Sequence, residues 1–123
     1  MMKVLITGTS QGIGKAIAER YLKESYEVIG IDRQEAGIYH DNYTHYQMDV
    51  RDYDRLPEIE GVNILVNNAG TQNEDDIDIN LKALIHITEK YGVQEKIRSV
   101  LNIGSASAHT GAEFPEYCAS KAG

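Results

Sequence analysis

The chain has 123 residues, 41% of them hydrophobic and 25% charged, which is enough for one globular domain with its own core. Its formal charge of -7 argues against a nucleic-acid partner, because such binding depends on many Lys and Arg contacts to phosphates. No apolar run is long enough to cross a bilayer and no signal-peptide pattern precedes Val4, so we expect a cytoplasmic protein that does not bind membranes. The single cysteine, Cys118, excludes an internal disulfide and a cysteine-rich metal site.

A glycine-rich turn, Thr7-Gly-Thr-Ser-Gln-Gly-Ile-Gly14, follows an aliphatic run at 3–6 and precedes an amphipathic segment at 12–25. This order predicts a strand, a tight turn and a helix. Glycine lacks the Cβ that would keep an anion from the main chain, and the first N–H groups of a helix point at such an anion. The spacing differs from the common G-x-G-x-x-G fingerprint, so the turn alone predicts only an anion site at a helix N-terminus.

The remaining elements alternate between strand and helix patterns. Further strands are predicted at 26–32, 43–48, 63–67 and 99–103, with a short helix within 52–59, a helix from about 75 to 91 and a last helix beginning at Phe114-Pro115. The apolar stripes of the two longer helices are Ile13, Ile17, Tyr21 and Leu22, and Ile77, Leu81, Leu84 with Ile85, Thr88 and Tyr91. We therefore expect one α/β domain, a Rossmann-type doubly wound parallel sheet with strand order 3-2-1-4-5, ending after the fifth strand.

Polar residues follow these predicted strands at the edge where open α/β sheets bind ligands. Besides the glycine turn, they are Asp32, Asp49, Asn67-Asn68 and Ser105. Asp32 lies roughly 20 residues beyond the glycine turn, where a carboxylate accepts a hydrogen bond from the ribose 2′-hydroxyl of a dinucleotide. The alternative interpretation is a surface acid that opens a turn.

Tyr117 and Lys121 are four residues apart near the end of the chain, so a helix would place them on the same face. A nearby ammonium favours the phenolate and lowers the pKa of a tyrosine, which would let Tyr117 act as acid or base near neutral pH. The pair arises easily by chance in a chain with 8 tyrosines, so its position after the fifth strand is what makes it a candidate.

Three segments together resemble the short-chain dehydrogenase/reductase family: the glycine turn matches its TGxxxGIG motif, Asn67-Asn-Ala-Gly70 its NNAG motif, and Tyr117 with Lys121 its YxxxK motif. The resemblance implies an oxidoreductase that transfers a hydride between a nicotinamide cofactor and a small-molecule alcohol or ketone. Tyr117 would then be the proton donor or acceptor, and Lys121 would lower its pKa and bind the nicotinamide ribose. Ser105 would hydrogen-bond the substrate oxygen, and Asn80 would order a water for proton relay.

The same resemblance implies a set of cofactor-binding residues: Gly8, Ser10, Gln11, Gly12, Ile13, Gly14, Asp32, Arg33, Asp49, Val50, Asn68, Ala69, Gly70, Tyr117 and Lys121. Asp49 and Val50 would lie beside the adenine. Because Asp32 would repel a 2′-phosphate, we expect NAD rather than NADP. Arg33 keeps NADP open, since its guanidinium could stack on adenine or pair with a phosphate.

Several candidates have a structural alternative. Ser107 competes with Ser105, and Asn80 could be a helix-surface amide. Asn67 is interpreted as structural, tying neighbouring strands. No metal site is expected, because the histidines His40, His45, His86 and His109 lack ligand spacing and fit solvated or packing roles, and the tyrosines between 39 and 53 fit strand and loop packing.

The sequence ends two residues after Lys121, whereas family members continue with further strands, helices and a substrate-covering loop. We therefore expect the N-terminal half of a family member, with an open edge on the fifth strand that favours a homo-oligomer. Two other functions stay open: a cofactor-binding remnant or interaction module without turnover, and an epimerase or dehydratase that shares the YxxxK pair. The sequence does not identify the substrate.

Overall fold

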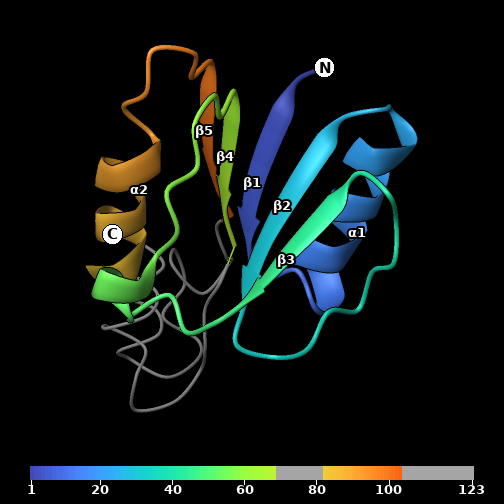
Figure 1. Cartoon of the computed structure of the whole chain (residues 1–123), viewed down its shortest axis with the longest axis horizontal. Coiled ribbons are helices and arrows are strands. Elements are labelled where there is room, and N and C mark those ends of the chain that lie inside the picture. The colour runs from blue at the N-terminus through green and yellow to red at the C-terminus, as the bar shows by residue number, and fades with distance from the viewer. Residues whose placement is uncertain (69–81, 104–123) are drawn as a thin grey trace, which may run out of the picture.

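A parallel five-stranded sheet forms the centre of the computed structural model, which describes residues 1–68 and 82–103 (Figure 1). The strands are β1 (Lys3–Thr7), β2 (Glu27–Asp32), β3 (Tyr43–Gln47), β4 (Ile64–Asn67) and β5 (Ser99–Asn102). They lie in the order β3-β2-β1-β4-β5, which confirms the predicted order. The helices are α1 (Gly12–Lys23), α2 (Leu84–Tyr91) and the 3-10 turn η1 (Tyr53–Arg55).

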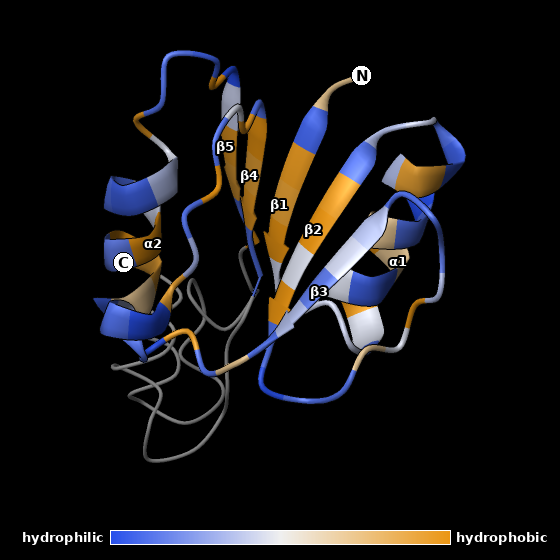
Figure 2. Cartoon of the chain, in the orientation of Figure 1, coloured by the Kyte–Doolittle hydropathy of each residue, from blue (hydrophilic) through white to orange (hydrophobic). Residues whose placement is uncertain are grey.

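Alternate residues of the central strand β1 face opposite sides of the sheet. Val4 and Ile6 pack with Ala18 and Leu22 of α1, whereas Leu5 belongs to a cluster that includes residues of α2. Figure 2 shows β1, β2 and β4 as largely hydrophobic and β3 as mostly polar. This pattern is typical of parallel strands that are covered on both faces, with a more exposed strand at the edge.

Helix α1 buries Gly14, Ala18 and Leu22 against the sheet, each four residues from the next. Ile13, which the sequence placed on the apolar stripe, is 63% exposed, so that part of the prediction was wrong. The small residues Gly14 and Ala18 face the strands, and Ile17 packs against the same cluster. Ile13 lies on another side of the helix and faces solvent.

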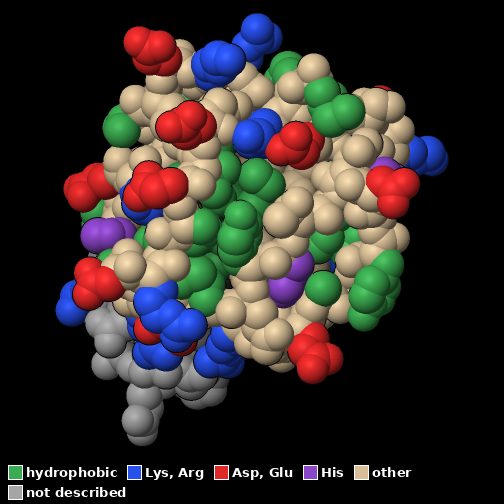
Figure 3. Space-filling view, in the orientation of Figure 1, with side chains coloured by type: hydrophobic (Ala, Val, Ile, Leu, Met, Phe, Trp, Pro, Cys, Tyr) green, Lys and Arg blue, Asp and Glu red, His purple; other side chains and the backbone are tan. Residues whose placement is uncertain are grey.

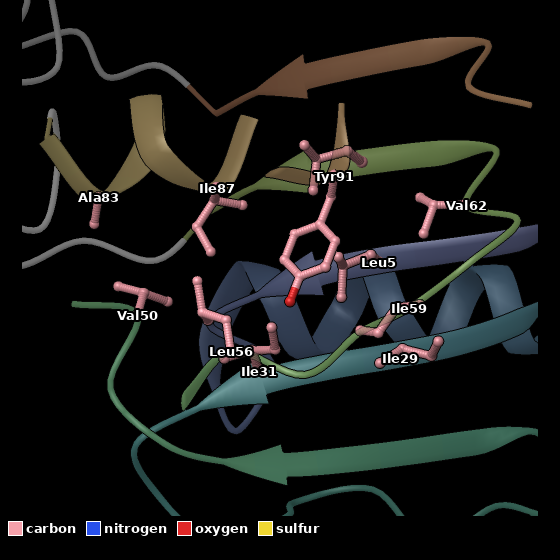
Figure 4. Packing of buried hydrophobic residues seen from close by; sticks show 11 residues of the cluster. Leu5, Ile29, Ile31, Val50, Leu56, Ile59, Val62, Ala83, Ile87 and Tyr91 are labelled. Carbon is pink, nitrogen blue, oxygen red and sulfur yellow. The ribbon is translucent and has the colours of Figure 1, made fainter. Parts of the chain in front are cut away.

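Helix α2 packs on the other face through Ala83, Ile87 and Tyr91. Ile85 is 46% exposed, so its assignment to the buried stripe was wrong, and Ile87, two residues later, takes that place. The earlier part of the predicted helix, with Ile77 and Leu81, lies outside the described residues. Figure 4 shows the Tyr91 ring in the middle of this cluster, beside the sheet residue Leu5.

The segment between β3 and β4 forms only the short turn η1, followed by chain without regular secondary structure, as the short helix predicted within 52–59 allows. Tyr91, which is 1% exposed, donates its hydroxyl to the Pro57 carbonyl at 2.6 Å. Gln94 accepts from the Val62 N–H at 3.0 Å and donates to the Ile59 carbonyl. The side chains of Tyr91 and Gln94 therefore pair main-chain groups of this segment, which in a helix would have paired with one another.

Hydrophobic side chains gather in the middle of the face seen in Figure 3, and charged side chains surround them. Within residues 1–68 and 82–103, no helix is both long enough and apolar enough to span a membrane.

Candidate functional site

The glycine turn joins β1 to α1 at the carboxyl edge of the sheet. Gly8 and Gly12 have φ angles of +78° and +63°, a left-handed conformation that side chains with a Cβ adopt at a cost. The Gly8 N–H donates to the Ile31 carbonyl of β2 at 2.8 Å. Gln11 precedes the helix in an extended conformation without capping it by its side chain, and the first helical turn carries no acid. The N–H groups of that turn and the positive end of the helix dipole can therefore bind an anion.

Gly14 brings α1 into close contact with the turn and with β4. A Cβ added to Gly14 would overlap the Gly8 carbonyl and the Asn68 side-chain nitrogen. Asn68 donates its side-chain N–H to the Gly8 carbonyl and its main-chain N–H to the Thr7 hydroxyl, both at 3.0 Å. By contrast, a Cβ on Gly12 would meet no atom of the described residues within 4 Å. The turn is thus braced on its inner side and open at Gly12, where an anion would approach.

Asp32 ends β2 beside this turn. Its Oδ2 accepts the Ser10 N–H at 3.0 Å, and its Oδ1 accepts the Gln34 N–H at 2.8 Å. Ser10 also donates its hydroxyl to the Glu35 carbonyl at 2.7 Å. The hydrogen bond from Gln34 matches the alternative interpretation of Asp32 as an acid that opens a turn. The hydrogen bond from Ser10 also ties the same carboxylate to the glycine turn. The geometry thus shows the turn-opening role, and binding of a ribose hydroxyl by Asp32 stays a prediction.

Asp49 and Val50 follow β3 and face different surroundings. The Asp49 carboxylate accepts three hydrogen bonds from Arg51: the main-chain N–H and Nε bind Oδ1, and Nη2 binds Oδ2 at 2.7 Å. Hydrogen bonding to the Arg51 guanidinium holds the pKa of Asp49 below its usual value, and the charge of Arg33 acts in the same direction. The Val50 side chain is 7% exposed and packs in the core, which leaves its main chain for any contact with a ligand.

A series of hydrogen bonds that the sequence did not predict leads to Gln34, whose N–H donates to Asp32. The Tyr43 hydroxyl is 2.7 Å from the Thr9 hydroxyl and 2.7 Å from Nδ1 of His45, and Nε2 of His45 is 3.0 Å from the Gln34 carbonyl. Burial raises the pKa of the Tyr43 phenol, the hydrogen bond with Thr9 opposes this, and the charge of Asp32 raises it further. One signal was available: Tyr43 and His45 are two residues apart on a strand, hence on one face.

Asn67 is 4% exposed and donates to the hydroxyl of Thr88 and to Oδ1 of Asn102, both at 3.0 Å. It ties β4 to β5 and to α2, which confirms its structural interpretation. The other candidates, Ala69, Gly70, Asn80, Ser105, Tyr117 and Lys121, lie outside the described residues. The structure therefore brings together the glycine turn, Ser10, Asp32 and Asn68, and it describes Arg33, Asp49 and Val50 along the neighbouring strand ends.

A parallel sheet in this order, with a glycine turn after β1 and an acid at the end of β2, defines a Rossmann-type fold. A family model described as short chain dehydrogenase matches residues 2–123. The chain belongs to the short-chain dehydrogenase family, whose members use NAD(P).

Named relatives agree with this assignment. The chain is 29% identical over 148 residues to a 3-oxoacyl-[acyl-carrier-protein] reductase of Buchnera aphidicola, covering 96% of this chain and 61% of the relative. It is also 29% identical over 136 residues to an NADP-dependent 3-hydroxy acid dehydrogenase of Shigella flexneri, covering 86% and 55%. A solved structure of a short-chain dehydrogenase/reductase family oxidoreductase from Burkholderia thailandensis is 27% identical with a TM-score of 0.88, covering 98% of this chain and 58% of that one. The chain thus spans somewhat more than half the length of these relatives.

Proposed function

We propose that the chain forms the cofactor-binding part of an oxidoreductase that prefers NAD(H) to NADP(H) and acts on the alcohol or ketone of a small molecule. The observation that carries this proposal is the Asp32 carboxylate, which hydrogen bonds hold at the end of β2 and beside the glycine turn. An acid in this position accepts from the ribose hydroxyls of NAD(H).

The residues of the turn fit a dinucleotide. The N–H groups at the start of α1 would hold the diphosphate, because the turn is open at Gly12, where a Cβ would have entered empty space. Asp32 would accept from the adenosine ribose. Asp49 would accept from the adenine amino group at Oδ2, which takes a single hydrogen bond from Arg51. The exposed Ile13 side chain would cover part of the bound molecule.

Catalysis would rest on residues outside the described part of the chain. When bound, the cofactor supplies or accepts a hydride at the substrate carbon. Tyr117 would hold the transferred proton at its phenol oxygen, and Lys121 would keep that phenol acidic. Ser105 would bind the substrate oxygen, and Asn80 would hold a water that returns the proton to solvent. These four roles follow from the family resemblance.

Preference for NAD(H) follows from the charge of Asp32, although one relative is named NADP-dependent. A carboxylate about 4 Å from a negative charge is repelled by roughly 1 kcal/mol in water and 4 kcal/mol at a partly buried site. Arg33 is exposed, and its charge helps to lower the pKa of Asp49. We therefore expect NADH to bind at least about tenfold more tightly than NADPH.

Fluorescence titration of the purified chain with NADH and NADPH tests this preference, and the absence of Trp leaves the nucleotide signal without a tryptophan background. Asp32→Asn should weaken NADH binding and bring the two dissociation constants closer together. Asp41→Asn, an exposed acid in the loop before β3, is the matched control and should leave both constants unchanged. Tighter binding of NADPH by the wild-type chain would overturn the preference.

Single-turnover hydride transfer from NADH to a panel of ketones tests the chemistry. We expect transfer that Tyr117→Phe abolishes while NADH still binds. Binding without transfer in the wild-type chain would instead favour the alternative, a cofactor-binding module without turnover.

Association between copies of the chain is part of the proposal. The edge strand β5 exposes Val100 and Leu101, and exposed apolar side chains on a sheet edge favour self-association. Sedimentation velocity should therefore detect a species larger than 13.7 kDa that Val100→Lys dissociates. A wild-type chain that sediments as a monomer at all concentrations would contradict this.

A further inference from the structure

A series of hydrogen bonds from Thr9 to Gln34 links the glycine turn, β3 and the loop after β2. The Tyr43 side chain begins at the first residue of β3 and its hydroxyl lies over Gly30 of β2, where an added Cβ would overlap both this hydroxyl and that of Thr9. Thr9 is 0% exposed. A glycine in the middle of β2 thus makes room for two hydroxyl groups from two different segments to meet.

The acceptor at the far end fixes the direction of these hydrogen bonds. The Gln34 carbonyl can only accept, so Nε2 of His45 carries the proton. In the neutral imidazole, Nδ1 then accepts from the Tyr43 hydroxyl, and the Tyr43 oxygen accepts from Thr9. Each donor has one acceptor, so the network is paired from the buried Thr9 hydroxyl to the exposed Gln34 carbonyl.

Gln34 connects this network to Asp32. The Gln34 N–H donates to Oδ1 of Asp32, and its carbonyl accepts from His45, so both main-chain polar groups of the residue are hydrogen-bonded. The Ser10 hydroxyl donates to the next carbonyl, that of Glu35. The loop after β2 is therefore fastened from two directions, by the glycine turn on one side and by β3 on the other.

We propose that His45 is a positioning residue of the cofactor site, which holds Gln34 and thereby fixes the Asp32 carboxylate for ribose recognition. This inference rests on the proposed preference for NAD(H). A carboxylate held in one orientation both accepts from the ribose hydroxyls and keeps its charge where a 2′-phosphate would lie. If the loop loses its hydrogen bond to His45, Asp32 can turn away. NADH then binds more weakly, because its ribose loses an acceptor, and NADPH is repelled less.

Two substitutions of His45 distinguish the hydrogen bond of Nε2 from that of Nδ1. In His45→Gln the amide nitrogen lies where Nε2 was and still donates to the Gln34 carbonyl, whereas in His45→Asn the shorter amide pairs with Tyr43 and does not reach Gln34. We expect His45→Gln to keep the wild-type ratio of NADPH to NADH dissociation constants and His45→Asn to lower it about fivefold, the effect of one lost hydrogen bond. Loss of general stability weakens both nucleotides alike and leaves this ratio unchanged.

The outcomes distinguish the inference from the proposed function. If the wild-type chain prefers NADH and the ratio stays at its wild-type value in both variants, or falls equally in both, the positioning role of His45 is overturned while the NAD preference stands. If the wild-type chain does not prefer NADH, the proposed preference fails, and the ribose-positioning role fails with it.

A second measurement needs no nucleotide and no variant. Long-range 15N–1H spectra of the imidazole distinguish the two neutral tautomers, and we expect the proton of His45 on Nε2. A neutral His45 with its proton on Nδ1 would overturn the hydrogen bond to Gln34, and with it the inference, even if His45→Asn fails to fold.

Discussion

Alanine at Gly14 tests how closely helix α1 approaches the glycine turn. The added methyl group would overlap the Gly8 carbonyl and displace the Asn68 side chain that donates to it. Overpacking of this kind costs about 1–3 kcal/mol and the lost hydrogen bond about 1 kcal/mol, whereas alanine gains about 1 kcal/mol in helix propensity. We expect Gly14→Ala to lower the free energy of unfolding by about 2 kcal/mol and to weaken NADH binding, because the turn has to move.

Gly12 and Gly61 provide matched controls. Both have left-handed φ angles, +63° and +73°, and within residues 1–68 and 82–103 a Cβ at either position would meet no atom within 4 Å. Alanine at either should cost about 1 kcal/mol, since strain of about 1–2 kcal/mol is partly offset by a less flexible unfolded chain. Of these two variants, only Gly12→Ala should also weaken NADH binding, by about tenfold or more, because Gly12 borders the proposed anion site and Gly61 does not.

Urea unfolding followed by circular dichroism gives the stabilities, and nucleotide fluorescence gives the affinities. The reasoning is refuted if Gly14→Ala is as stable as the wild-type chain, since that would mean the helix does not approach the turn closely. It is equally refuted if Gly12→Ala and Gly61→Ala affect NADH binding alike, because the turn would then not be where the nucleotide binds.

Two further substitutions test the packing around the site. The pKa of Tyr91 is raised by burial and by the charges of Glu58 and Tyr46. The folded chain therefore keeps this phenol protonated at pH values where the unfolded chain ionises it, and stability is lost as pH rises above about 10. Tyr91→Phe should cost about 1 kcal/mol at pH 7 and flatten that loss, as urea unfolding between pH 8 and pH 11 measures; equal slopes would contradict the assignment. Asn67→Leu removes both amide hydrogen bonds of a buried residue and should cost about 2 kcal/mol at pH 7. A loss below about 0.5 kcal/mol, the usual scatter of surface substitutions, would contradict its structural role.

The sheet order and the strand positions could be predicted because their causes are local. The aliphatic runs of β1, β2 and β4 are typical of buried parallel strands, and parallel strands that alternate with helices leave few topologies. The positions of the glycine turn and of Asp32 at strand ends follow from the same pattern.

The helix faces were less well predicted. Ile13 and Ile85 are apolar and occur at helical spacing, yet both are exposed. Hydrophobic periodicity locates the buried side of a helix only to within one neighbouring residue. Which residues are buried depends on how closely the helix approaches the sheet. In α1 the contact of Gly14 with the turn decides it, and in α2 the fit of Ile87 and Tyr91 against the sheet does.

By itself the sequence determined the family, the strand order and the type of each candidate residue, because motif spacing and hydrophobic pattern are properties of neighbouring residues. Only the tertiary structure decided what holds the site together. The Asn68 side chain reaches Gly8 across 60 positions of the chain, and Tyr43 reaches Thr9 across 34. Such contacts arise when parallel strands bring their carboxyl ends to one edge, and the loops there pair whichever polar groups the fold places within hydrogen-bonding distance.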